Sequence, residues 1–144
     1  MNGYRIIDFE EHYFERLNRF WNATGLGGSL RGDNAEIIMS TIHSGGHLLL
    51  MIDNSDEIIG SSWITNDKRR TYLHHFGIRE DMRRKGLAKI LLKRSMEIAK
   101  ADGYQIKLEV GRENHAAMAL YKNYGFKDLG DYEVLIIRDI TTIS

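Results

Sequence analysis

The sequence predicts a mixed α/β fold in which a sheet carries helices on both of its faces. Two observations support this prediction. Apolar segments of strand length follow one another directly in the first half of the chain, and strand and helix patterns alternate in the second half. Consecutive strands favour antiparallel pairing, whereas a strand, a helix and a further strand favour a parallel pair with the helix packed on the sheet. Residues 1–144 are predicted to form a single domain.

The first half is expected to begin with a strand over residues 4–9. Apolar residues at helical spacing then predict a helix over residues 13–21, followed by a glycine-rich loop over residues 25–32. Asp33, with Glu36 three residues later, resembles a capping box and predicts the start of a second helix.

Three strands are expected next, over residues 47–53, 58–65 and 71–78. The turn between the first two is rich in polar residues, and three basic residues precede the third. This succession predicts an antiparallel part of the sheet.

The second half predicts a long helix over residues 84–100, because its leucines and isoleucine recur on one stripe. A strand over residues 106–110 and a helix over residues 114–124 follow, and Gly125 is expected to end that helix. A final hairpin is expected, with residues 132–140 as its long arm.

The composition excludes several classes of protein. The chain contains no cysteine, so it has no disulfide framework, no thiolate zinc site and no cysteine nucleophile. Apolar residues make up 42% of the chain, too many for a disordered protein. The longest uninterrupted apolar run, residues 48–52, is far shorter than the roughly 20 residues of a membrane-spanning helix. A soluble, cytoplasmic protein is therefore expected.

The formal net charge of zero conceals an asymmetry along the chain. Residues 1–67 carry four basic and ten acidic side chains, and the rest of the chain carries sixteen basic and ten acidic ones. Eight of the basic side chains lie in residues 79–100. Such a block suits nucleic acid, an anionic membrane or a phosphorylated ligand, so its place in the fold decides between them.

The segment that joins the third of these strands to the long helix predicts an anion site. The helix begins near Gly86, and the unpaired N–H groups of a helix start, with the positive end of its dipole, attract anions. Glycine at 86 and alanine at 88 leave the main chain accessible, and basic residues surround it. A pyrophosphate cradle is one interpretation; a basic first turn on a solvated helix is the other.

Two motifs together resemble the GCN5-related N-acetyltransferase (GNAT) superfamily. Arg83-x-x-Gly86-x-Ala88 is similar to the pyrophosphate signature of that family, with Ile78 five residues before it. The family's second motif is matched by Asn114, Ala117, Leu120, Tyr121, Gly125 and Phe126. The resemblance is sharp over about residues 71–130.

The resemblance implies the acyl-CoA N-acyltransferase fold and acetyl-CoA as the acetyl donor. In that fold the twisted sheet is mostly antiparallel, and its fourth and fifth strands form a parallel pair that splays apart. The implied coenzyme-binding residues are Phe76, Gly77, Ile78, Arg83, Arg84, Lys85, Gly86, Leu87, Ala88, Lys89, Asn114, Ala117 and Tyr121. In the family the loop at residues 25–32 borders the acceptor pocket, where its glycines are expected to supply mobility.

The resemblance also implies the catalytic groups. Tyr121 is the candidate acid for the departing thiolate, and packing on its helix is the alternative. Two candidates remain open for the base. Glu109 lies in an arrangement similar to the ribosomal-protein alanine N-acetyltransferases, and His74 lies where arylalkylamine N-acetyltransferases carry a histidine. Glu109 is expected to project from the opposite face to its strand neighbours, and His75 to point away from His74 as a structural residue.

The implied activity is an acetyl-CoA-dependent N-acetyltransferase, an acyltransferase that acts on a primary amine by direct attack in a ternary complex. The alternative is a non-catalytic acyl-CoA-binding sensor of the same fold. The acceptor is expected to be a small-molecule or peptide amine. No nucleic-acid partner is expected, because phosphate binding accounts for the basic block. No membrane partner is expected, and no metal either, because His43 and His47 are four residues apart but straddle a glycine pair and so do not form a helical ligand pair. The choice between a monomer and a homodimer stays open.

Overall fold

The computed structural model describes residues 3–144, which form two compact units. The first unit ends at Glu109 and contains the sheet and three helices; the second comprises Val110–Ser144 and contains one. The single domain over residues 1–144 stays a prediction.

The first unit is built on one five-stranded sheet with the strand order β1-β2-β3-β4-β5. Neighbouring strands pair antiparallel except β4 and β5, which are parallel. The strands are β1 (Tyr4–Asp8), β2 (His47–Asp53), β3 (Ile58–Asn66), β4 (Arg70–Ile78) and β5 (Gln105–Leu108). This topology confirms the predicted mixed sheet with its parallel pair.

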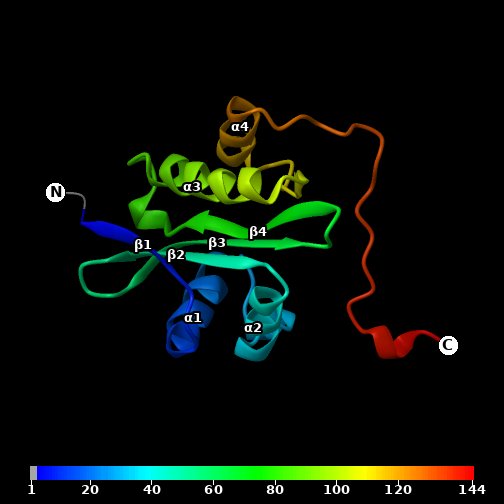
Figure 1. Cartoon of the computed structure of the whole chain (residues 1–144), viewed down its shortest axis with the longest axis horizontal. Helices are drawn as coiled ribbons and strands as arrows, with labels where there is room; N and C mark the ends of the chain where they lie inside the picture. Colours follow the sequence, from blue (N-terminus) through cyan, green and yellow to red (C-terminus); the bar gives the residue numbers. More distant parts are fainter. Residues whose placement is uncertain (1–2) are drawn as a thin grey trace. The chain divides into compact units, whose positions relative to one another are not determined.

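Helices cover both faces of this sheet, as predicted. Figure 1 shows α1 (Phe14–Thr24) and α2 (Ala35–His43) on one face and α3 (Leu87–Asp102) on the other. Three short 3-10 turns join these elements: η1 (Glu11–Tyr13), η2 (Ser29–Arg31) and η3 (Glu80–Met82).

The core lies between the sheet and the helices on each side. Residues 48–52 of β2 are all buried, since β2 lies between β1 and β3 and packs against α2. Trp21 of α1 and Trp63 of β3 stack at a ring-centre distance of 5.6 Å on the α1 and α2 face. Their indole N–H groups are bonded to Ser61 and Thr41, at 2.9 and 3.0 Å, so neither buried tryptophan leaves a donor unsatisfied.

The second helix begins one residue later than its sequence signal predicts. The cap of α2 is Asn34, whose Oδ1 accepts from the main-chain N–H of Ile37 at 2.8 Å. Asp33 is therefore not the cap, because its carboxylate accepts from the N–H of Gly28 and contacts His75 instead.

Two further boundaries differ from the sequence prediction. The long helix starts at Leu87 rather than at residue 84, because Arg84 and Gly86 adopt left-handed conformations with φ of 65° and 78°. Strand β5 ends at Leu108, so Glu109 lies just outside it, and the alternation that was to orient Glu109 does not apply there.

The second unit contains α4 (His115–Tyr124) and a short turn, η4 (Ile140–Thr142). Gly125 ends α4 as predicted, with its N–H bonded to the main-chain oxygens of Lys122 and Tyr121. The predicted hairpin with residues 132–140 is wrong: residues 126–139 form no strand, and the side chain of Leu135 is 89% exposed. A strand needs a neighbouring strand edge, and the second unit offers none.

No helix within residues 3–144 is both long enough and apolar enough to cross a membrane.

Candidate active site

The parallel pair of strands parts halfway along β4. Its pairing with β5 runs from Arg70, opposite Gln105, to Leu73, opposite Leu108, and goes no further. Residues 74–78 of β4 continue past the end of β5, so they pair in the sheet with β3 alone. The predicted donor-binding residues Phe76, Gly77 and Ile78 all lie in this stretch.

A tight turn connects the end of β4 to α3. Arg83 donates from its Nε to the main-chain oxygen of Ile78 at 3.0 Å. The first residue of the pyrophosphate motif therefore folds back on the last residue of β4, and the structure brings these two predicted site residues together.

The N-terminus of α3 leaves its first donors without an acceptor in the helix. The first bond of the helix ladder runs from the N–H of Ile90 to the oxygen of Gly86, and no side chain caps this end. The N–H groups of Leu87, Ala88 and Lys89 precede that ladder. Apart from its chain neighbours, Gly86 has no atom within 4 Å of the place where a Cβ would stand, so the space on that side of Gly86 is open.

Basic side chains surround this open space. Four of them are exposed: Arg83, Arg84, Lys85 and Lys89. Within residues 3–144 none of the four forms an ion pair with a carboxylate, whereas nearby Arg79 is held by Asp81 at 2.7 Å. Unpaired cations beside unpaired N–H donors suit a polyphosphate group, so these residues fit the phosphates of coenzyme A.

The sheet face that carries α1 and α2 also carries His74, in the middle of β4. Its Nε2 lies 2.9 Å from the Oγ1 of Thr65, and its ring packs near Trp63 and Tyr72. Desolvation, reinforced by the neighbouring His75, lowers the pKa of His74 below its usual value. A histidine with a lowered pKa is neutral at pH 7 and can accept a proton.

His75 lies on the same face as His74, so the predicted opposite orientation is wrong. The β3–β4 register passes from Ser61 opposite Gly77 to Trp63 opposite His74, which places one extra residue in β4. His75 absorbs this bulge with a φ of 46°. Both imidazoles consequently face Trp63, at ring-centre distances of 6.2 Å for His74 and 5.2 Å for His75.

The bulge brings His75 to Asp33, a contact that the sequence analysis missed. The Nε2 of His75 lies 2.8 Å from the Oδ2 of Asp33, and the same oxygen accepts from the N–H of Gly28 at 2.8 Å. The side chains of His75 and Asp33 are 23% and 14% exposed. The only sequence feature that could have indicated this contact was the dense run of glycines before Asp33, since glycines allow a close approach of the main chain.

Gly27 and Gly28 of this loop are closely packed, whereas Gly25 and Gly32 have no atom near an added Cβ; the expected mobility of the loop stays a prediction. A Cβ on Gly27 would stand 2.6 Å from the Oδ2 of Asp33 and would overlap the ring of His75. The same loop is held at a second point, because Leu26 packs where a Cβ on Gly77 would stand, with 2.8 Å between that position and its Cδ1. The loop therefore contacts β4 at two residues, His75 and Gly77.

The remaining predicted residues belong to α4 in the second unit. Asn114 caps the helix, its Oδ1 accepting from the N–H of Ala117 at 3.2 Å. Tyr121 is buried, with its ring 5.7 Å from that of Phe126. Burial raises the pKa of Tyr121 to about 12, so its hydroxyl stays protonated at neutral pH.

Glu109 follows β5 with an exposed side chain, and within residues 3–144 it forms no ion pair. The described part of the chain also gathers no group of three or more side chains able to hold a metal ion.

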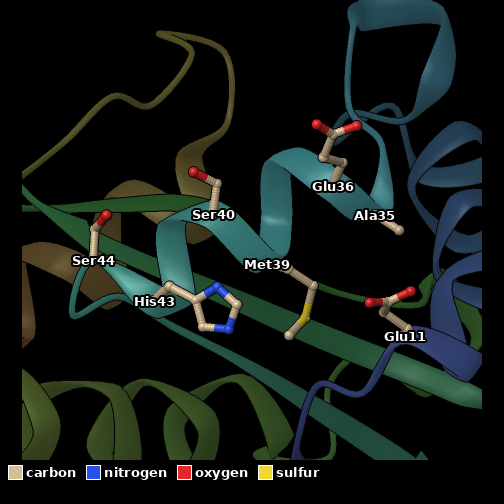
Figure 2. A pocket seen from close by; sticks show the side chains of 7 residues that line it. All are labelled: Glu11, Ala35, Glu36, Met39, Ser40, His43 and Ser44. Carbon is tan, nitrogen blue, oxygen red and sulfur yellow. The ribbon is translucent and has the colours of Figure 1, made fainter.

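A groove of about 590 Å³ lies along α2, away from the predicted donor-binding residues. Figure 2 shows Met39 and His43 projecting from the side of α2 near Glu11. The groove is lined by Glu11, Ala35, Glu36, Met39, Ser40, His43 and Ser44. None of the predicted catalytic or coenzyme-binding residues lines it.

Comparison with known sequences matches this chain to the acetyltransferase (GNAT) family over residues 8–126. Human N-acetyltransferase 8 is 28% identical over 105 residues, which cover 68% of this chain and 46% of the human protein. The chain thus spans about half the length of this relative.

Solved structures share the fold. The GNAT-family acetyltransferase of Streptococcus pneumoniae superposes with a TM-score of 0.70 at 27% identity, over 91% of each chain. A predicted acetyltransferase of Clostridium acetobutylicum, solved with acetyl-CoA, superposes with a TM-score of 0.72 at 16% identity, over 92% of this chain and 96% of that one.

Proposed function

The chain belongs to the GNAT acetyltransferase family, and from that premise we propose that it transfers the acetyl group of acetyl-CoA directly to a primary amine. The acceptor is a small-molecule or peptide amine. A cytoplasmic location and the absence of a nucleic-acid partner belong to the same proposal.

The N-terminus of α3 is the observation that carries this proposal. It offers main-chain donors at Leu87, Ala88 and Lys89, in front of an open space, with unpaired basic side chains beside them. Main-chain donors at a helix start bind phosphate oxygens, and the helix dipole adds to the attraction. The pyrophosphate of the coenzyme is therefore assigned to this turn.

The donor's pantetheine arm is assigned to the stretch of β4 that has parted from β5. Residues 76–78 extend beyond the last β4–β5 pair, at Leu73 and Leu108, and they lead directly into the phosphate turn. A linear donor that ends in a pyrophosphate suits this continuous path. On the family resemblance, Asn114 and Ala117 are also proposed to contact the acetyl donor.

The reaction needs an acid, a base and a donor for the oxyanion. Deprotonating an amine with a pKa near 10.4 at neutral pH costs roughly 4–5 kcal/mol, so a base is expected to assist. Glu109 and His74 are the candidates that the sequence supplies. Tyr121 is the proposed acid for the thiolate, since its hydroxyl holds its proton at neutral pH. Main-chain N–H near Ile78 is the proposed oxyanion donor.

Transfer is proposed to be direct because the chain has no cysteine to carry the acetyl group. The nitrogen–carbon bond forms as the carbon–sulfur bond breaks. Converting an ammonium and acetyl-CoA to an amide and free coenzyme A releases one net proton to solvent.

A thiol-release assay tests the proposal with an unusually clean background, because this cysteine-free protein contributes no thiol. Acetyl-CoA would be incubated with spermidine, kanamycin, glucosamine, lysine and an alanyl peptide in turn. Release above the rate without acceptor is the expected result. Calorimetry with acetyl-CoA accompanies the assay. Binding of acetyl-CoA without thiol release for every amine would favour the acyl-CoA sensor. Absence of both binding and release would overturn the proposed function.

A further inference from the structure

The bulge in β4 places His75 in a backbone conformation that is costly for a residue other than glycine. Its φ of 46° lies in the left-handed region, which a residue with a Cβ rarely adopts. Such strain costs of order 1–3 kcal/mol and persists where the surroundings hold it, most often at functional sites. Ser61 holds the strained peptide, donating from its Oγ to the main-chain oxygen of His75 at 2.6 Å.

Asp33 determines which ring nitrogen of His75 carries the proton. Burial raises the pKa of Asp33, but hydrogen bonds from His75 and from the N–H of Gly28 outweigh it, and the net pKa lies below the ordinary value. An ionised carboxylate only accepts hydrogen bonds, so Nε2 of His75 must donate. In the neutral ring the lone pair is therefore on Nδ1.

That lone pair is accessible to solvent. Within the described residues the only buried side-chain nitrogen or oxygen atoms without a hydrogen-bond partner are Thr71 Oγ1 and Asp102 Oδ2. No hydrogen bond joins His75 Nδ1 to another described residue, and the atom is not among the buried unpaired ones, so it keeps some contact with solvent. The opposite edge of the ring is closed by Gly27, whose Cβ would overlap it. The ring thus presents one basic nitrogen outward.

Two tryptophans hold the orientation of the imidazole. Trp21 and Trp63 meet it edge to face, at ring-centre distances of 4.7 and 5.2 Å. A base that is fixed by a carboxylate on one nitrogen and by aromatic packing on its faces does not have to reorient before it accepts a proton.

We propose that His75 is the base that takes the proton of the acceptor amine through Nδ1, with Asp33 as its positioning residue. This inference rests on the proposed acetyl transfer, because His75 directly precedes residues 76–78, to which the acetyl donor is assigned. The proton of the attacking nitrogen moves to Nδ1 while the nitrogen–carbon bond forms and the carbon–sulfur bond breaks. His75 then returns it to solvent, and the thiolate takes its own proton from the acid.

His75 has a carboxylate partner that fixes its tautomer, which the other two candidate bases lack. His74 is bonded to the hydroxyl of Thr65, and within residues 3–144 no carboxylate lies within ion-pair distance of it. Glu109 is exposed and follows the end of β5. The other titratable or charged groups near the dyad are His74, with a ring centre 6.5 Å from that of His75, and Arg31, whose charge lowers the pKa of Asp33.

The first test needs no acceptor. Nitrogen-15 NMR of the imidazoles above their titration range reports which ring nitrogen is protonated. The expected signal for His75 is a protonated Nε2 and an unprotonated Nδ1. Asp33→Asn should change the ratio of the two neutral tautomers. A neutral ring with its proton on Nδ1 would overturn the proposal.

The second test measures kcat/KM against pH with the best amine of the thiol-release panel. His75→Gln is expected to lower kcat/KM by about 100-fold or more, the range of general-base catalysis, and to reduce the slope of log kcat/KM on the acid side by one. Asp33→Asn is expected to lower kcat/KM by at least about tenfold, since the carboxylate fixes the tautomer. His12→Gln, on the exposed η1 turn, is the matched control.

Unaltered acetyl-CoA affinity and a cooperative unfolding transition would show that these variants are folded. An unchanged acid-side slope in a folded, active His75→Gln protein would overturn the role of His75 and leave the proposed acetyl transfer intact. Absence of thiol release from the wild-type protein with every amine would instead overturn the acetyl transfer itself.

Discussion

Arg83 and Ile78 are joined by a hydrogen bond from the guanidinium Nε to the main-chain oxygen, 3.0 Å long. The arginine of the pyrophosphate motif therefore closes the turn between β4 and α3 from the inside. Its neighbour Arg84 is exposed and, within residues 3–144, has no hydrogen-bonded partner for its side chain. Two adjacent arginines with the same charge thus have different tasks.

Arg83→Ala is expected to lower the free energy of unfolding by about 0.5–1.5 kcal/mol, the value of one hydrogen bond of this kind. Arg84→Ala removes the same charge from the same turn and is expected to change stability by less than about 0.5 kcal/mol. Urea unfolding of the two variants makes the comparison. Equal losses of stability would show that the bond from Arg83 contributes nothing.

Gly86→Ala is expected to weaken acetyl-CoA binding more than it destabilises the fold. Gly86 has a φ of 78°, and Gly103 at the other end of α3 has a φ of 84°; neither would have an atom near an added Cβ. An alanine at either position carries the same left-handed strain of roughly 1–2 kcal/mol. Gly103→Ala is therefore a matched control for strain, away from the phosphate turn.

The measurement is acetyl-CoA affinity by calorimetry beside urea unfolding. Similar losses of stability are expected, with a loss of affinity of about tenfold, or 1.4 kcal/mol, for Gly86→Ala alone. If both variants bind acetyl-CoA like the wild type, the phosphate site lies elsewhere.

Tyr121→Phe is expected to lower kcat by about 100-fold with little change in the KM for acetyl-CoA, as for the loss of an acid that acts only in the transition state. Tyr124→Phe, on the same helix with a 44% exposed side chain, is the control. Equal kcat values for the two variants would remove Tyr121 from the mechanism.

The pKa of Tyr121 adds a test of stability against pH. Its pKa is raised from 10.0 to about 12, so the unfolded chain loses this proton first. The contribution of the buried hydroxyl is complete below pH 10.0 and is lost as the pH rises through about 12. The wild-type protein should therefore lose stability relative to Tyr121→Phe in that range.

Gly27→Ala is expected to separate Asp33 from His75, because the new Cβ would occupy the space of their contact. Overpacking of this kind costs roughly 1–3 kcal/mol. Gly111→Ala is the control, since nothing lies within 4 Å of its added Cβ and its φ is not left-handed. The nitrogen-15 signal of His75 should change in Gly27→Ala alone, and an unaltered signal would mean that the loop gives way without breaking the pair.

Asp33→Asn is expected to destabilise the fold at neutral pH by about 1–3 kcal/mol, because it removes a partly buried charged acceptor. The pKa of Asp33 lies below its ordinary value of 3.8, so the unfolded chain binds the proton first as the pH falls. The contribution is present above pH 3.8 and disappears as the pH falls through the folded-state pKa. The free energies of unfolding of the wild type and of Asp33→Asn, plotted against pH, should accordingly converge in acid.

Asp139→Asn is a control for this pH dependence. Hydrogen bonds from Thr141 also lower the pKa of Asp139, but its carboxylate is fully exposed and screened by water. This variant should leave the acid profile of stability close to that of the wild type. If the free energy of unfolding of Asp33→Asn differs from that of the wild type by the same amount at every pH, the side chain of Asp33 matters for packing and not for its charge.

The elements that local pattern specifies were predictable. Strand β2 was predicted over residues 47–53 as observed, since its apolar run is bounded by a glycine pair and a polar turn. The end of α4 at Gly125 was predicted from the left-handed preference of glycine. The turn proposed to bind phosphate could be identified from the sequence because its residues are contiguous in the chain.

The contact between Asp33 and His75 was not predictable in the same way. Alternation along β4 placed His75 on the wrong face, because one bulged residue reverses every later orientation and leaves no mark in the apolar pattern. Asp33 was assigned to a helix cap, a role that suits the same side chain, while its real partner lies 42 residues away. Residues 132–140 have strand composition, but composition does not supply a neighbouring strand.

The start of α3 and the pair on β4 differ in how they withstand mutation. Leu87, Ala88 and Lys89 present their main-chain N–H groups, which every amino acid except proline possesses, and proline is absent from this chain. Substitutions at these positions preserve the main-chain N–H groups, so the positions can change in evolution without loss of the proposed phosphate contacts. The contact between Asp33 and His75 is made by side chains, and a single codon change removes it. The contact between Asp33 and His75 is therefore the more easily lost of the two in evolution.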